Sequence, residues 1–225
     1  MSKIVSAVIV YFWGLVLLSC NSSPNSSTEN SEKGEKATSA LSQKKNILIF
    51  GNSLTAGYGL EPDEAYPSIL QQKIDSLGLP YKVINAGVSG ETTAGGNSRL
   101  DWVLKTKVDI FVLELGGNDG LRGIPASETR KNLQAMIDKV KAKYPDAVII
   151  LAGMQVPPSM GKKYGDEFRG IYPQIAKDNN VALIPFLLEG VGGEVALNQK
   201  DGIHPNAQGA KIVAHNVWEI LKDLL

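Results

Sequence analysis

Cysteine and histidine are both scarce in this chain of 225 residues, and charge of neither sign predominates. The one cysteine is Cys20, so an internal disulfide framework and a cysteine-ligated metal site are excluded. The formal net charge is zero, with no basic block and no interleaving of basic and aromatic residues, which argues against a nucleic-acid partner. No second His or Cys is at hand to complete a tetrahedral metal site with His204. We therefore expect neither a metal nor a cofactor.

An apolar run long enough to span a membrane is also lacking. The stretch Ile4 to Leu18 covers about fifteen residues, whereas a spanning helix needs about 20. It follows Lys3 and ends just before Ser19 and Cys20, a pattern typical of a secretory signal whose end resembles the bacterial lipobox. We expect residues 1–19 to be a lipoprotein signal peptide and Cys20 to carry the lipid. The protein would then be exported and anchored to a bacterial cell-envelope membrane, facing the periplasm or the surface. A retained anchor and plain secretion are the alternatives.

Residues 20–42 are rich in Ser, Asn, Glu and Lys and contain almost no large apolar side chain. Such a segment cannot bury enough surface to offset its ordering entropy, so we expect a flexible tether. Residues 43–225 remain, roughly 180, which are enough for one well-buried domain and too few for two comfortable ones. We expect this domain to be a monomer.

Short apolar runs alternate with longer amphipathic stretches in residues 43–225. The apolar runs predict β-strands at Ile47–Phe50, Tyr81–Asn85, Ile110–Glu114, Val148–Ala152 and Val181–Ile184. Helical periodicity predicts α-helices at Tyr66–Leu77, Gly96–Lys105, Ser127–Tyr144, Asp166–Asn179 and Asn206–Leu224. Strands separated by helices of this length imply right-handed crossovers and a parallel sheet covered on both faces. The predicted fold is a three-layer α/β/α sandwich with a five-stranded parallel sheet.

Polar and glycine-rich clusters follow four of the predicted strands. These clusters are Gly51 to Ser53, Gly87 to Thr92, Gly116 to Asp119 and Asp201 to His204. In open parallel sheets, ligand sites lie beyond the carboxyl ends of the strands. Four loops from distant parts of the sequence are therefore expected to meet along one edge of the sheet.

Ser53, His204 and Asp201 have the chemistry of a nucleophile, a general base and an orienting carboxylate. His204 would take the proton of the Ser53 hydroxyl, and Asp201 would hold the other imidazole nitrogen. Ser53 also fits an ordinary helix N-cap, which is the alternative at that position. The other histidine, His215, lies inside the last predicted helix and is interpreted as a surface or packing residue.

An acyl-transfer site also needs donors for a developing oxyanion. The candidates are the backbone N–H groups of Ser53 and Gly90 and the side-chain amide of Asn118. Gly90 has no Cβ, so its loop can approach a substrate closely. Turn formation alone also accounts for Gly90, and an Asx-turn for Asn118. The sequence has neither the G-x-S-x-G elbow nor the spacing of a phosphate-binding loop.

These residues resemble the GDSL (SGNH) hydrolase family over nearly all of residues 46–225. Four blocks occur in the family's order, namely Gly51–Gly59, Asn85–Thr93, Glu114–Arg122 and Asp201–Asn206. The resemblance implies a flavodoxin-like SGNH fold, with Ser53, Asp201 and His204 as the catalytic residues and Ser53, Gly90 and Asn118 as the oxyanion hole. The third block and Gly170-Ile-Tyr-Pro173 look most like the thioesterase, lysophospholipase and arylesterase branch.

One position departs from the family pattern, which usually has Asp where this chain has Asn52. The implied catalytic roles do not use that carboxylate, and an asparagine can still cap a helix or bond nearby backbone groups. The change removes a negative charge beside Ser53, which can alter the pH profile. We expect activity to survive.

The sequence thus indicates a serine esterase that hydrolyses carboxylic esters or thioesters, such as acyl, aryl or lysophospholipid esters, through an acyl-Ser53 intermediate. The loop Met154 to Met160 can supply an apolar wall for an acyl chain, or it can be an ordinary Pro-rich connection. A carbohydrate O-deacetylase using the same residues is an alternative. A tethered binding protein without turnover is another, although it would have no need of Ser53, Asp201 and His204 together.

Overall fold

A five-stranded parallel sheet organises residues 44–225, which are the residues that the computed structural model describes. The predicted signal peptide (1–19), the predicted lipid site Cys20 and the predicted tether (20–42) lie outside them. Within residues 44–225, no helix is both long enough and apolar enough to cross a membrane.

All five predicted strands form, in the order β2-β1-β3-β4-β5, and every neighbouring pair is parallel. Their bounds are β1 Lys45–Gly51, β2 Tyr81–Gly87, β3 Ile110–Glu114, β4 Val148–Ala152 and β5 Ala182–Ile184. β3 and β4 match the prediction, and β5 begins one residue late. β1 and β2 are longer than predicted because they pair along their whole length, through Gly51 opposite Gly87. Backbone pairing does not require the apolar side chains on which the prediction relied.

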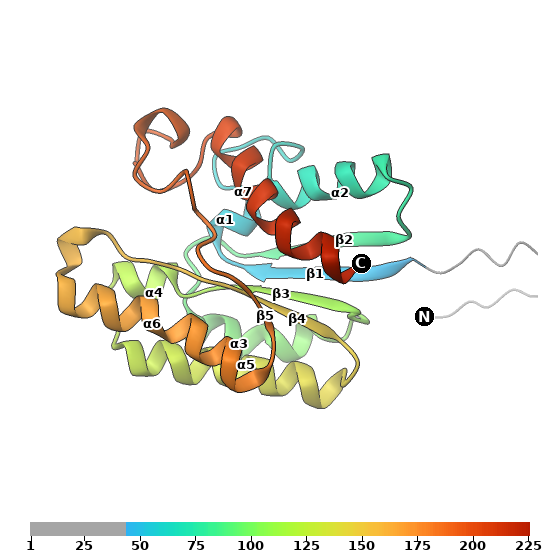
Figure 1. The fold of residues 1–225 in the computed structure, drawn as a ribbon, viewed down its shortest axis with the longest axis horizontal. Coiled ribbons are helices and arrows are strands. Elements are labelled where there is room, and N and C mark those ends of the chain that lie inside the picture. The colour runs from blue at the N-terminus through green and yellow to red at the C-terminus, as the bar shows by residue number, and fades with distance from the viewer. Residues whose placement is uncertain (1–43) are drawn as a thin grey trace, which may run out of the picture. The chain divides into compact units, whose positions relative to one another are not determined.

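Helices cover both faces of the sheet, as predicted (Figure 1). α1, α2 and α7 lie on one face, and α3, α4, α5 and α6 lie on the other. The bounds are α1 Ser53–Ala56, α2 Tyr66–Ser76, α3 Thr93–Val103, α4 Gly117–Leu121, α5 Ala126–Lys143, α6 Lys162–Asn179 and α7 Ala207–Leu221. Short 3-10 turns occur at η1 Pro158–Met160, η2 Val195–Leu197 and η3 Lys222–Leu224. The short helices α1 and α4 were not predicted, because a single turn is too short to show helical periodicity.

Two helices begin about one turn earlier than predicted, and α5 begins one residue earlier, at Ala126 rather than Ser127. α3 begins at Thr93 rather than Gly96, because the Thr92 hydroxyl accepts a hydrogen bond from the backbone N–H of Gly95 at 3.3 Å and caps the helix. α6 begins at Lys162 rather than Asp166, and these two side chains form an ion pair across the first turn. Most residues of the two extra turns are polar or small, and the one large ring among them, Tyr164, does not make an apolar stripe by itself.

The sheet order places the crevice expected of this fold class between β1 and β3. β1 pairs with β2 on one side and with β3 on the other, so the chain reverses its direction of winding there. In open parallel sheets, ligands bind outside the carboxyl ends of the strands at such a switch point. β3 is buried along its whole length, including Glu114 at its carboxyl end. The crevice is therefore flanked by Ser53, which follows β1, and by Asn118, which follows β3.

Candidate active site

Ser53 is the first residue of α1 and is separated from the end of β1 only by Asn52. The N-cap of this helix is Asn52, whose side-chain oxygen accepts a hydrogen bond from the backbone N–H of Leu54 at 2.9 Å. The interpretation of Ser53 as the N-cap is therefore wrong, whereas the expected capping role of Asn52 is present. The Ser53 hydroxyl instead lies 2.9 Å from Nε2 of His204, across 151 residues of sequence.

Asp201 and His204 come from a single turn of chain. Oδ2 of Asp201 lies 2.6 Å from Nδ1 of His204, and Oδ1 accepts hydrogen bonds from the backbone N–H groups of Ile203 at 2.9 Å and of His204 at 3.0 Å. These backbone bonds, first that of His204 and then that of Ile203, together with the ring contact, lower the pKa of Asp201 to about 2. Asp201 is thus a carboxylate at neutral pH, with each oxygen facing a donor.

The three side chains make one series of contacts from carboxylate to imidazole to hydroxyl. We assign the ring proton of neutral His204 to Nδ1, because the ionised Asp201 can only accept a hydrogen bond. Nε2 is then free to accept the proton of the Ser53 hydroxyl. Such a series can deprotonate the serine while it attacks a carbonyl and can stabilise the imidazolium that results.

The candidate oxyanion donors lie around the same edge. The backbone N–H of Ser53 is at the first position of α1, where N–H groups have no partner within the helix. Nδ2 of Asn118 donates to the carbonyl of Glu91 at 2.9 Å, which orients the amide and leaves its second N–H available. Gly90, next to that carbonyl, has φ +79°, and an added Cβ would meet nothing closer than Arg122 at 4.0 Å. Glycine is needed here for its left-handed backbone, and the open space beside it is compatible with the close approach of a substrate, which stays a prediction.

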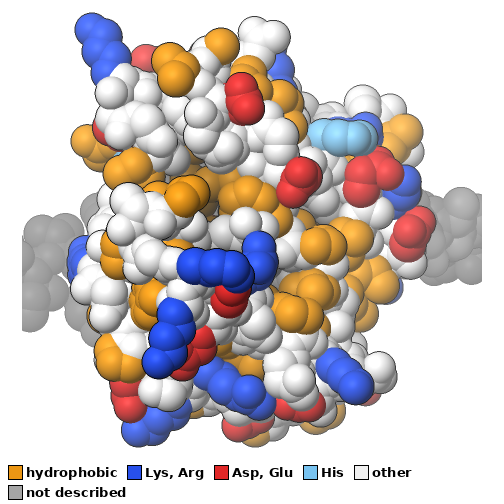
Figure 2. Space-filling view, turned by 60° about the vertical axis from the view of Figure 1, so that its left-hand side comes forward, with side chains coloured by type: hydrophobic (Ala, Val, Ile, Leu, Met, Phe, Trp, Pro, Cys, Tyr) orange, Lys and Arg blue, Asp and Glu red, His pale blue; other side chains and the backbone are white. Residues whose placement is uncertain are grey.

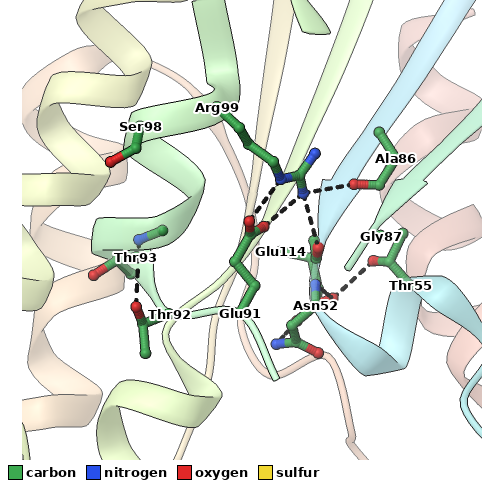
Figure 3. A network of polar contacts seen from close by, with 12 residues as sticks. Asn52, Thr55, Ala86, Gly87, Glu91, Thr92, Thr93, Ser98, Arg99 and Glu114 are labelled. Carbon is green, nitrogen blue, oxygen red and sulfur yellow. Dashed lines mark hydrogen bonds and ion pairs between the residues drawn. The ribbon is translucent and has the colours of Figure 1, made fainter. Parts of the chain in front are cut away.

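Arg99 of α3 ties together the strand ends and the loop that carries Gly90 (Figure 3). Its guanidinium donates to both carboxylate oxygens of Glu91, at 2.6 Å from Nε and 2.5 Å from a terminal nitrogen. The same nitrogen reaches the carbonyl of Ala86 at 2.8 Å and that of Gly51 at 3.3 Å. A paired, partly buried guanidinium of this kind holds its partners in a fixed geometry. The Gly90 loop is thereby attached to the ends of β1 and β2.

Glu114 lies beneath the Ser53 turn and is fully buried. Its Oε1 accepts from Nδ2 of Asn52 at 2.7 Å, and its Oε2 accepts from the backbone N–H of Asn52 at 3.0 Å and from the Thr55 hydroxyl at 2.7 Å. The Thr55 oxygen is also 2.7 Å from the Tyr66 hydroxyl. Burial raises the pKa of Glu114 from 4.5 to about 7, although the hydrogen bonds from Thr55 and Asn52 act in the opposite direction.

The raised pKa of Glu114 predicts that folding stability falls as pH rises. The folded protein holds the Glu114 proton more tightly than the unfolded chain does, so its contribution is complete below pH 4.5 and is lost as pH rises through about 7. Urea unfolding of wild type and Glu114→Gln should differ by an amount that changes by about 3 kcal/mol between pH 4 and pH 8. A difference that stays constant over this range would contradict the assignment.

A groove of about 430 Å³ opens beside Ser53 and His204. Its apolar lining comes from Leu121 of α4, from Met154 and Val156–Pro158 after β4, from Phe186 and Leu188 after β5, and from Ile203. Figure 2, with the side that carries the carboxyl ends of the strands turned forward, shows hydrophobic side chains around a hollow on this face. Ligand sites commonly have this size and this mainly apolar lining, with a few polar groups. The Met154–Met160 loop does contribute a wall, although Met160 itself does not line the groove.

Tyr58 lies against the catalytic candidate His204, whereas the other histidine, His215, lies elsewhere on the surface. The ring of Tyr58 lies against that of His204, with 4.6 Å between their centroids, a contact that no sequence signal indicated. His215 is exposed on α7, where Nδ1 lies 3.8 Å from Glu219. This position agrees with its interpretation as a surface residue.

Comparison with known proteins accounts for this combination of sheet, loops and polar contacts. The model of the GDSL-like Lipase/Acylhydrolase family matches residues 49–212, which include Ser53, His204 and Asp201. The chain belongs to this family. Esterase TesA of Pseudomonas aeruginosa is 41% identical over 180 residues, which are 80% of this chain and 89% of that protein. The family has the α/β fold that the resemblance implied.

Three further comparisons extend the likeness. The Escherichia coli K12 protein named Thioesterase 1/protease 1/lysophospholipase L1 is 39% identical over 180 residues, covering 80% of this chain and 84% of that protein. A solved crystal structure of TesA superposes with a TM-score of 0.77 and 40% identity, covering 80% of this chain and all of that one. An arylesterase of Vibrio mimicus is 38% identical over 190 residues, covering 84% of this chain and 93% of that protein. The expected thioesterase, lysophospholipase and arylesterase branch is therefore represented among relatives of this GDSL hydrolase.

Proposed function

We propose that this GDSL hydrolase is a serine esterase with Ser53 as its nucleophile, and that its substrates are carboxylic esters or thioesters with an apolar acyl group. One observation carries the proposal. The Ser53 hydroxyl is in contact with His204, His204 is in contact with the ionised Asp201, and this series opens onto an apolar groove.

The proposed reaction has two steps. In the first, Nε2 of His204 takes the Ser53 proton while Oγ attacks the ester carbonyl, and the resulting imidazolium gives that proton to the leaving alcohol or thiol. In the second, His204 deprotonates a water that attacks the carbonyl carbon of acyl-Ser53, the imidazolium returns that proton to Oγ as the ester bond breaks, and the acid and free Ser53 are released. Asp201 keeps Nδ1 protonated throughout and stabilises the imidazolium. The N–H groups of Ser53, Gly90 and Asn118 would stabilise the oxyanion in both steps.

The groove supports the substrate class. An ester bond at Ser53 would place its acyl chain along side chains that are mainly aliphatic or aromatic. Burial of each added methylene stabilises a bound chain by about 0.8 kcal/mol, so several methylenes should change kcat/KM strongly. The relative TesA is named an esterase and the Escherichia coli relative a thioesterase and lysophospholipase, which agrees with acyl esters. The acetyl group of an O-acetylated carbohydrate would fill only a small part of this groove.

The location of the enzyme is a further part of the proposal. The apolar segment Ile4 to Leu18 and the sequence around Cys20 support export and attachment of a lipid at Cys20. Residues 20–42 would then be a tether that holds a monomeric hydrolase near a bacterial cell-envelope membrane, where amphiphilic esters concentrate. Retention of the mature protein in a detergent phase, and its release by Cys20→Ser, would test this point.

The function is tested with p-nitrophenyl esters of acetate, butyrate, octanoate and palmitate, together with a fluorophosphonate probe. We expect kcat/KM to peak at a medium chain and the probe to add its phosphonyl mass to the peptide that contains Ser53. A steep preference for acetate would favour the O-deacetylase. Absence of both turnover and labelling would leave only a binding protein.

A further inference from the structure

Glu114 is a buried carboxylate that the proposed chemistry does not use. Among residues 44–225, none of the ion pairs includes it, and three hydrogen-bond donors occupy its two oxygens. Two of these donors belong to Asn52 and the third to Thr55, so all three lie on the turn that bears Ser53. A buried carboxylate without an ion-pair partner is costly to fold around even when it accepts hydrogen bonds, and its presence here needs a reason.

The donors around Glu114 have fixed directions. The side-chain oxygen of Asn52 must face the N–H of Leu54, which can only donate, so Nδ2 necessarily faces Oε1 of Glu114. The single proton of the Thr55 hydroxyl points to Oε2, and the Tyr66 hydroxyl can therefore donate to the Thr55 oxygen. Figure 3 shows Asn52, Thr55 and Glu114 at the end of β1. Every one of these donors is satisfied when both oxygens of Glu114 accept, which is the ionised form that prevails above its pKa of about 7.

Gly51 makes room for this arrangement. A Cβ at residue 51 would lie 2.2 Å from the Thr55 hydroxyl oxygen and 2.3 Å from Oε2 of Glu114. β1 and β3 place Gly51 opposite Glu114 in the sheet, so the carboxylate reaches the turn across the space that a side chain would fill. The backbone on both sides of Ser53, from Gly51 to Thr55, is thereby held against the end of β3.

We propose that Glu114 is a positioning residue for the nucleophile, which acts by fixing the Asn52–Ser53 turn so that the Ser53 hydroxyl faces His204. The inference rests on the proposed role of Ser53. It also gives Asn52 a purpose, because an amide at this position donates to Glu114. A second carboxyl group there would have to share a proton with Glu114, because two carboxylates at this distance cannot both be ionised.

Glu114→Gln isolates the acceptor role, since it keeps the shape of the side chain. The amide oxygen of the new side chain must accept from the Asn52 backbone and from Thr55, so its NH₂ group would face Nδ2 of Asn52, donor against donor. We expect kcat for p-nitrophenyl butyrate to fall about 10- to 100-fold with little change in KM, because a misplaced nucleophile affects the chemical step. The rate of fluorophosphonate labelling should fall in parallel.

The double variant Asn52→Asp with Glu114→Gln should restore the hydrogen bond between the two side chains with donor and acceptor exchanged. The introduced aspartate would accept from Leu54 with one oxygen and from the NH₂ group of the introduced glutamine with the other. We expect kcat to recover to within about fivefold of wild type, and such non-additivity is the sign of direct contact. A merely structural role for Glu114 predicts no such rescue.

Asp109→Asn is the matched control, because it also converts a carboxylate to an amide beside β3. Asp109 accepts the backbone N–H of Asn46 at 2.8 Å at the opposite end of the sheet, so this variant should lower the melting temperature without changing kcat. If Glu114→Gln does not fold, Thr55→Val removes one donor to Glu114 and should reduce kcat about threefold to tenfold.

The outcomes separate this inference from the proposed function. An active wild type with unchanged kcat in the folded Glu114→Gln or Thr55→Val variant overturns the positioning role alone. Loss of kcat that the double variant does not repair also overturns it. A wild type that neither turns over esters nor reacts with the fluorophosphonate overturns the proposed function, and the inference with it.

Discussion

Ser53→Ala should lower kcat for p-nitrophenyl butyrate by roughly 10⁴- to 10⁶-fold. The substitution removes the only atom that can form the acyl intermediate and leaves the groove and the Asn52 cap in place. KM should therefore change little, because the acyl chain still binds the same apolar lining. The residual rate would come from the oxyanion donors and from substrate binding.

The measurement compares steady-state kinetics of wild type, Ser53→Ala and His215→Ala, with thermal melting of each. His215 is the other histidine and is exposed on α7, so its removal should leave kcat unchanged. The alanine at residue 53 should leave the melting temperature within a few degrees of wild type. Comparable rates for wild type and Ser53→Ala would show that another group carries the reaction.

Asp201→Asn should lower kcat by about 10³- to 10⁴-fold, for a reason that the local geometry makes specific. Oδ1 of Asp201 accepts two backbone N–H groups, those of Ile203 and His204. An asparagine must therefore keep its oxygen on that side and turn its NH₂ group toward Nδ1 of His204. The ring would then carry its proton on Nε2, where it faces the Ser53 hydroxyl and cannot accept the serine proton.

This prediction has its own structural readout. In wild type, proton NMR should show an Nδ1 proton hydrogen-bonded to a carboxylate, far downfield, and this signal should be absent in Asp201→Asn. Asp201→Ala is the comparison, because it removes the carboxylate without forcing the tautomer, and it should be less impaired than the asparagine variant. If both variants lose activity equally, the tautomer argument is wrong even if Asp201 matters.

The sheet was predictable because its strands are short apolar runs between polar turns. β3 and β4 were placed to the residue on that basis, and polar clusters at strand ends indicated where the site should be. Ser53, His204 and Asp201 indicate catalysis in the sequence because a nucleophile, a base and a carboxylate each follow a predicted strand. Their contact, however, requires 151 residues of intervening chain to fold, so the sequence can suggest it only by the position of the loops.

Other parts of the site left no such sign in the sequence. Glu114 ends a buried strand, but the sequence does not show whether a carboxylate at that position faces solvent or the Asn52 turn, which is 62 residues earlier. The register of Gly51 against Glu114 creates their contact, and register depends on the whole sheet. Tyr58 against His204 and the groove residues Phe186 and Leu188 likewise depend on loop conformations that follow no periodic pattern.

Asp201 and His204 lie in one tight turn, whereas Ser53 is 151 residues away from His204 in sequence. The site therefore needs one local contact and one long-range contact to form. The mutual geometry of Asp201 and His204 is encoded locally and can form whenever that turn forms. The position of this turn relative to Ser53 depends instead on a long-range contact, in which Nε2 of Gln199 donates to the carbonyl of Tyr58 at 2.6 Å. Heat or denaturant that breaks the Gln199–Tyr58 contact would separate His204 from Ser53 while the sheet remains folded. Activity should therefore be lost before the fold is lost.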